Sequence, residues 1–178
     1  VVTMLSLANS GLLGSGKLVV PLFMIIGFFA IGIGGLFELR NGDIFGGTFG
    51  VVYATFLLAT AVALRFFAPA ADASPAVVKA FGGEVGSLFL LFALISFIFT
   101  AAARIVNRTA VAAFALLAVV LLLAGLANII GGSTGADLTK AAGYVGLLDG
   151  AAAFWLATGI LMNVMHGKDI IPLGAAKA

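Results

Sequence analysis

Cysteine is absent from the 178 residues, histidine occurs once, and charged side chains make up only 9% of the chain. The lack of cysteine excludes disulfides, thiolate metal sites, iron–sulfur clusters and cysteine nucleophiles. A single histidine, His166, cannot form a multi-histidine metal centre, so we expect no metal and no cofactor. The nine Lys and Arg residues form no basic cluster of the kind that binds nucleic acid, and no nucleic-acid partner is expected.

Apolar residues take the place of the missing charge. They make up 63% of the chain, compared with roughly 45–50% in soluble proteins, so a water-soluble domain is excluded. A helix needs about 20 consecutive apolar residues to cross a membrane, and five stretches meet this requirement. With a shorter apolar stretch at the start, they predict helices over residues 1–13, 18–37, 44–64, 85–103, 109–130 and 141–165.

The predicted fold is an all-α membrane protein, a bundle of six transmembrane helices that forms a single domain over residues 1–178. Residues 1–13 are too short to span a membrane, and we interpret them as the second half of a first helix that begins before Val1. Residues 65–84 contain Pro69 and Pro75 and are expected to form an aqueous loop. A slight excess of Lys and Arg in the segments on one side predicts that both termini are cytoplasmic.

Pairs of glycines at four-residue spacing occur in several of the predicted helices. Small residues at this spacing let helix backbones approach closely in a membrane, where no hydrophobic force draws helices together. The pairs are Gly46–Gly50, Gly82–Gly86 and Gly146–Gly150. Packing within one subunit and packing between subunits would both use them, and the sequence leaves the two open.

Polar side chains at membrane depth are costly and are often functional. Asp149 lies within the last predicted span, where it either couples a proton or substrate, pairs with a residue such as Lys140, or reaches a shallow interface. Tyr53 lies mid-span and needs a hydrogen-bond partner, in a packed core or along a pore. Glu38 ends a span beside Arg40, which is typical of a solvated helix end. No two acidic residues share a helix face, so catalysis is not expected.

Several segments, in order along the chain, resemble one known family. Residues 37–46 (FELRNGDIFG), 139–148 (TKAAGYVGLL) and 171–174 (IPLG) are similar to the patterns W-E-F-R-x-G-N-T-F-G, T-K-A-G-G-Y-L-G-L-L and L-P-x-G of the acetate uptake transporter family. Tyr53 falls at the Tyr of the family's T-S-Y-G segment, and Ala127-Asn128 falls at its G-N. The family includes the bacterial succinate–acetate permeases.

The resemblance implies a homohexamer in the cell inner membrane, with a separate pore in each protomer for acetate, succinate and related small carboxylates. A Phe, a Tyr and a Leu form a narrow apolar constriction in the family. Tyr53 and Leu117 match the last two, and the Phe would precede Val1. The chain departs from the family at Val51-Val52, which replace Thr-Ser, and at Asp149, a position that is usually uncharged.

A mechanism follows from the chemistry of the substrate. Acetate, with a pKa of about 4, is an anion at neutral pH, and moving it through hydrocarbon unaided is expensive. Asn9, Asn128 and Thr48 are candidate donors that would replace its water, and Asp149 or Glu38 could carry a coupled proton. A passive channel and a proton symporter stay open at this point. So do two other functions: a carboxylate-sensing membrane protein that does not conduct, and a channel for small neutral solutes such as urea.

Overall fold

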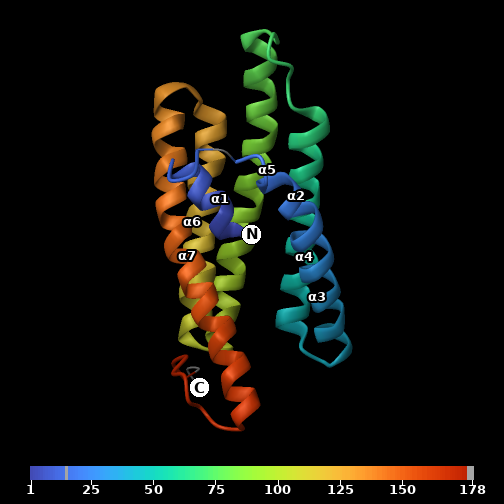
Figure 1. Ribbon diagram of the computed structural model, residues 1–178, viewed down its shortest axis with the longest axis vertical. Coiled ribbons are helices and arrows are strands. Elements are labelled where there is room, and N and C mark those ends of the chain that lie inside the picture. Colours follow the sequence, from blue (N-terminus) through green and yellow to red (C-terminus); the bar gives the residue numbers. More distant parts are fainter. Residues whose placement is uncertain (15, 176–178) are drawn as a thin grey trace.

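The computed structural model describes residues 1–14 and 16–175, and within these residues it contains helices and no strand. The helices form an elongated bundle (Figure 1). In the labels used here η marks a π- or 3₁₀-helical segment. The elements are α1 (Val2–Asn9), α2 (Val19–Leu22), η1 (Phe23–Ala30), α3 (Ile31–Arg40), α4 (Ile44–Val62), η2 (Ala63–Phe67), α5 (Pro75–Ala102), η3 (Ala103–Ile105), α6 (Arg108–Ile130) and α7 (Gly132–His166).

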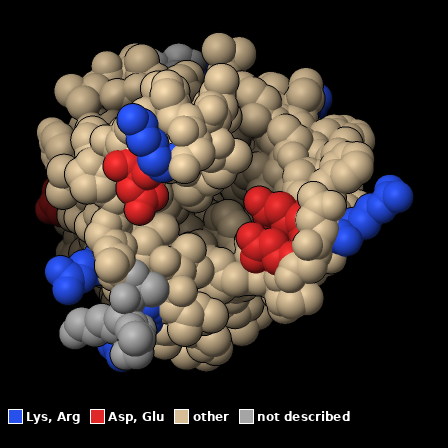
Figure 2. Space-filling model, turned by 90° about the horizontal axis from the view of Figure 1, so that it is seen from below, with Lys and Arg blue, Asp and Glu red and all other residues tan. Residues whose placement is uncertain are grey.

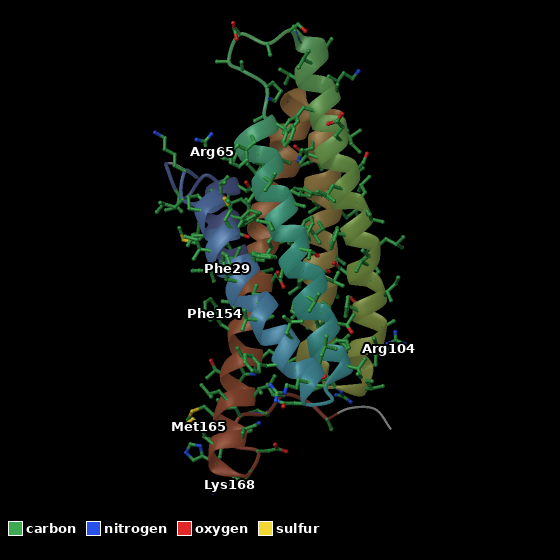
Figure 3. The ribbon with its side chains drawn as sticks, turned by 90° about the vertical axis from the view of Figure 1, so that its right-hand side faces the viewer. Phe29, Arg65, Arg104, Phe154, Met165 and Lys168 are labelled. Atoms are coloured by element: carbon green, nitrogen blue, oxygen red, sulfur yellow. The ribbon has the colours of Figure 1, made fainter. Side chains whose placement is uncertain are left out.

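Five helical stretches are long and apolar enough to cross a membrane: Val19–Arg40, Ile44–Phe67, Pro75–Ile105, Arg108–Ile130 and Gly132–His166. The prediction of an all-α, multi-pass membrane fold is therefore confirmed. The predicted residues 1–13 contain the short helix α1, which packs against α7. Large apolar side chains cover the outside of the bundle, including Phe29 and Phe154 (Figure 3), as expected for a surface that faces lipid.

Two helices extend further than their apolar runs. Helix α5 begins at Pro75, ten residues before the predicted start at residue 85, so residues 65–84 are not an aqueous loop throughout. Proline is favoured at the first position of a helix, because its missing N–H would have no partner there. Helix α7 begins at Gly132, after a turn in which Gly131 and Gly132 adopt positive φ angles of 64° and 62°. The apolar pattern marks the part of each helix that lies in the membrane and not the whole helix.

Glycines bring neighbouring helices into backbone contact within the protomer. A Cβ on Gly50 of α4 would lie 2.7 Å from the Cα of Gly35 of α3. A Cβ on Gly82 of α5 would lie 2.7 Å from the carbonyl oxygen of Asn128 in α6.

Helix α1 is held against α7 in the same way. The Gly146–Gly150 pair faces α1, and a Cβ on Gly150 would lie 2.6 Å from Oγ1 of Thr3. Of the predicted pairs, Gly82–Gly86 and Gly146–Gly150 therefore pack helices inside one protomer.

Aromatic rings, and not glycines, form the contact between α4 and the two helices α5 and α6. We call this layer the aromatic seam. Ring centroids within it lie 4.1 to 6.3 Å apart. The seam separates the α2–α4 side of the bundle from the side that contains α1, α5, α6 and α7 (Figure 1). Its members are Phe45, Phe49, Tyr53, Phe56, Phe89, Phe92, Phe99 and Phe114.

Candidate functional site

Tyr53 occupies the middle of α4 and is 5% exposed. Its ring lies in the aromatic seam, with centroid distances of 4.7 Å to Phe49 and 5.8 Å to Phe92. Its hydroxyl forms a hydrogen bond with Oγ of Ser96 in α5. Because the Ser96 hydroxyl donates to the Phe92 carbonyl at 2.7 Å, Tyr53 is the donor to Ser96. The phenol is therefore held toward the protein interior and not toward lipid.

Ser96 is a member of this site that the sequence interpretation missed. It is fully buried, and it is the one side chain of α5 that bonds to Tyr53. A lone serine inside the apolar run of residues 85–103 is the signal that could have found it, because a hydroxyl at membrane depth needs a partner.

Asp149 lies at the middle of α7 and is 4% exposed. Its carboxyl forms no hydrogen bond or ion pair with any residue that the structure describes. Lys140 is nine residues away, about 13 Å along the helix, so Asp149 does not pair with it. The burial also excludes a position at the membrane surface. The structure thus overturns two of the alternatives for this residue and keeps the one in which it faces the interior.

Tyr53 and Asp149 come from helices on different sides of the bundle, and both side chains are buried inside it. Asp149 is close enough to the Tyr53 hydroxyl for the two groups to interact electrostatically. Leu117 of α6 is half-buried and packs against the clusters that contain Tyr53 and Phe114. The structure therefore places a phenol and an aliphatic side chain in one packed cluster, with a buried carboxyl within electrostatic reach of the phenol.

The candidate donors are distributed over other parts of the bundle. Asn9 ends α1 and is half-buried against Gly143 of α7. Asn128 lies near the end of α6, where its Nδ2 donates to the Ala124 carbonyl at 2.8 Å. Thr48 is exposed and lies about 140° around α4 from Tyr53, since five residues separate them. The structure does not bring Thr48 together with Tyr53.

Glu38 lies at one end of the bundle, where α3 turns into α4. It is exposed, and its carboxyl and that of Asp43 lie 2.7 and 2.9 Å from the place where a Cβ on Gly46 would be. A view onto this end shows a hollow in the middle of the face, with acidic side chains at its rim (Figure 2). Glu38 therefore lies at an exposed end of the bundle, which we call the mouth, and not with the buried Asp149.

Within the described part of the chain, no group of three His, Asp or Glu side chains could hold a metal ion. The buried polar side chains inside the bundle are few, and they include Ser6, Thr60, Ser96 and Asp149 on four different helices. Five apolar spans around such an interior define a multi-pass membrane protein of the transporter and channel class.

The chain belongs to the GPR1/FUN34/yaaH family, whose model matches residues 1–168. The prediction of the family is thereby confirmed. The chain is 30% identical over 172 residues to the succinate-acetate/proton symporter SatP of Escherichia coli (strain K12), a match that covers 96% of this chain and 87% of the relative. It is 29% identical over 180 residues to a protein of Methanothermobacter thermautotrophicus, covering 95% of this chain and 82% of that protein.

The fold also matches a solved structure, that of the bacterial acetate channel SatP. The two structures agree with a TM-score of 0.82 at 26% identity, over 97% of this chain and 92% of the other. The relatives are named as a symporter in one case and as a channel in the other.

Proposed function

We propose that the protein transports acetate and related small carboxylates, including succinate, across the cell inner membrane through the interior of each protomer. The observation that carries this proposal is the burial of Tyr53 and Asp149 inside the bundle, within electrostatic reach of each other and with Leu117 packed in the cluster of Tyr53. Membership of a family whose named members move acetate and succinate supports it. We assign transport and not catalysis, because the related proteins are named as a symporter and a channel.

Tyr53 and Leu117 form the narrowest part of the proposed pathway. An apolar neck excludes large hydrated ions, while a small carboxylate can pass if it loses its water for a short distance. Asn9 lies toward one end of the pathway with a side-chain amide that makes no hydrogen bond within the described residues. That amide and the one of Asn128 are the proposed donors that replace water before the neck.

Asp149 is the proposed proton carrier for coupled transport. Its carboxyl has no hydrogen-bond partner among the described residues and lies beside the neck, so a proton on it can be exchanged with the pathway. Glu38, at the mouth, is positioned to exchange protons with bulk water. In a proton symporter both carboxyls would carry protons. In a passive channel neither carboxyl would be needed for transport.

The proposed assembly rests on the resemblance to the family, and the proposed orientation rests on the distribution of Lys and Arg. We propose a homohexamer with both termini in the cytoplasm. The many large apolar side chains on the outside, such as Phe29, Leu94 and Phe154, support contact with lipid or with neighbouring copies.

The test is flux into proteoliposomes that contain the purified protein, measured with radiolabelled acetate, urea and glycerol. We expect acetate to enter faster than into protein-free vesicles, while urea and glycerol enter at the protein-free rate. Leu117→Ala should widen the neck and speed succinate entry relative to acetate. Leu94→Ala, on the exposed side of α5, is the matched control and should leave this ratio unchanged.

Two outcomes would contradict the proposal in different ways. Urea entry as fast as acetate entry would indicate a channel for neutral solutes. Acetate binding, seen as a change in the fluorescence of Trp155 or by calorimetry, without any flux would indicate a carboxylate sensor.

A further inference from the structure

A cavity lined by none of the pathway residues lies where η3 leads into α6. It has a volume of about 570 Å³ and is lined by Arg104, Asn107, Arg108 and Val111. Arg104 lies in η3, just after the end of α5, on the outer side of the bundle and far from Arg65 (Figure 3). Two of the four lining residues are therefore cations at the edge of the membrane-spanning region.

The lining residues offer several side-chain donors, and none of the four is acidic. Neither Arg104 nor Arg108 forms an ion pair with any acidic residue of the described chain. Asn107 is 8% exposed, and its Oδ1 accepts a hydrogen bond from the Ala110 N–H at 2.7 Å. The Nδ2 of Asn107 has no acceptor within the described residues. This nitrogen is accessible at the surface of the cavity, so a ligand or water can supply its acceptor.

The backbone donors at the start of α6 are already used. The N–H groups of Arg108 and Thr109 donate to the carbonyls of Gly174 and Leu173 at 3.2 and 3.0 Å. The Thr109 hydroxyl also donates to Leu173, at 2.9 Å. The cavity therefore presents side-chain donors, two guanidinium groups and one amide, and does not rely on the free end of a helix.

The same C-terminal segment positions one of the two arginines. A Cβ on Gly174 would lie 2.9 Å from Cβ of Arg108, so the tail packs against the base of this side chain. Holding the stem of an arginine reduces the conformational entropy lost when its guanidinium binds an anion.

Exposed apolar residues place the cavity at the membrane surface. Ile105 and Val106, between the two arginines in sequence, are 75% and 38% exposed. Arginines beside lipid-facing apolar residues at helix ends lie at the level of the lipid headgroups. The guanidinium fork matches phosphate oxygens and binds them through two parallel hydrogen bonds.

We propose that this cavity binds a phosphate group, supplied by the headgroup of an anionic phospholipid. The phosphate oxygens would accept hydrogen bonds from both guanidinium groups and from Nδ2 of Asn107. None of the residues of this site belongs to the proposed acetate pathway, so the proposed lipid binding does not depend on the proposed transport function.

The test compares the full-length protein with Arg104→Gln/Arg108→Gln and with a matched double variant, Arg65→Gln/Lys79→Gln. The control removes two exposed cations from the other end of the bundle. Phosphatidylglycerol is added to protein in phosphatidylcholine nanodiscs, and retained lipid is counted by native mass spectrometry after gentle release. We expect roughly tenfold weaker retention in the cavity variant, because charge-assisted hydrogen bonds are lost, and unchanged retention in the control.

A second variant and a second probe keep the result interpretable. Arg104→Lys/Arg108→Lys keeps the charge and removes the fork, so it should fall between the wild type and the Gln variant even if the latter folds poorly. Inorganic phosphate, titrated into protein in phosphatidylcholine alone, tests a free ligand. The readout for both ligands is the midpoint of thermal unfolding. If inorganic phosphate raises this midpoint as much as phosphatidylglycerol does, the proposal that the phosphate comes from a lipid is wrong. Equal phosphatidylglycerol retention in the cavity variant and the control would overturn the site.

Discussion

Helix α4 packs in two different ways on its two sides. Toward α3 it presents Gly47 and Gly50, which lie directly against the backbone around Gly35. Toward α5 and α6 it presents Phe49, Tyr53 and other rings of the aromatic seam. The first contact consists mainly of backbone atoms, with the Leu39 side chain of α3 lying against Gly47. The second contact consists almost entirely of aromatic side chains.

This difference indicates where the bundle can open. Backbone contacts at glycines are fixed by sterics, because any change of register brings backbone atoms into collision. Aromatic side chains can change rotamer within a helix framework that stays in place. We infer that α3 and α4 move as one unit, and that passage of a carboxylate requires rearrangement in the aromatic seam around Tyr53.

The largest expected effect comes from breaking the glycine side of α4. Gly50→Ala would place a methyl group 2.7 Å from the Cα of Gly35, so α3 and α4 must separate. Overpacking typically costs about 1–3 kcal/mol, and we expect a clear drop in the midpoint of thermal unfolding in detergent.

Gly34 provides the matched control for this change. A Cβ at Gly34 would meet no atom within 4 Å, and replacing glycine by alanine in a helix stabilises it by about 0.5–1 kcal/mol. Gly34→Ala should therefore leave the midpoint unchanged or raise it. Equal midpoints for the two variants would show that the α3–α4 contact is not fixed by Gly50.

The contrast between the two sides of α4 was only partly predictable from the sequence. Length and hydropathy identify the spans, because lipid requires about 20 apolar residues from each. They do not locate the helix ends that project into water, as the early start of α5 at Pro75 shows. Charged residues such as Lys79 continue the same helix beyond the membrane and do not end it.

Interior and exterior positions were harder to predict. Most residues of a span are apolar on all sides of the helix, so hydropathy does not separate the face toward lipid from the face toward the protein. Thr48 and Tyr53 are therefore equally plausible pathway residues in sequence, although they lie on different sides of α4. The hydrogen bond from Tyr53 to Ser96 depends on how α4 and α5 are rotated relative to each other. The amino-acid sequence alone does not reveal this rotation.

The second prediction concerns the pH dependence of transport. If Asp149 carries the proton, uptake rises as pH falls, because a larger share of its carboxyl groups is protonated. The side chain of Asp149→Asn cannot titrate, so this variant should keep only the pH dependence of acetate itself. Above its pKa of about 4, the neutral form of acetate increases about tenfold for each unit by which pH falls. The measurement is the initial rate of labelled acetate uptake into proteoliposomes from neutral to acidic pH.

Glu38→Gln is the comparison for this experiment. It removes a carboxyl from the exposed mouth and should keep the slope of the wild-type profile. A profile that is unchanged in Asp149→Asn and flattened in Glu38→Gln would move the coupling site from the interior to the mouth.

A smaller effect is expected for Tyr53→Phe, which keeps the ring in the aromatic seam and removes its hydroxyl. Ser96 retains its bond to the Phe92 carbonyl, so no donor is left unpaired, and the loss of one hydrogen bond costs about 0.5–1.5 kcal/mol. Acetate uptake should change severalfold while the protein stays folded. The Ser96→Ala variant removes the same bond from the α5 side, and effects that differ strongly between the two would show that the phenol acts on the substrate directly.

The smallest expected effect is at Thr48, on the side of α4 turned away from Tyr53. Thr48→Val keeps the shape of the side chain and removes its hydroxyl at an exposed position. Substitutions at such positions change free energies by about 0.5 kcal/mol or less, so acetate uptake should change less than about twofold. A loss as large as that of Tyr53→Phe would mean that carboxylate passes along the outer face of α4, between neighbouring subunits, and the aromatic seam would then be a structural contact and not the pathway.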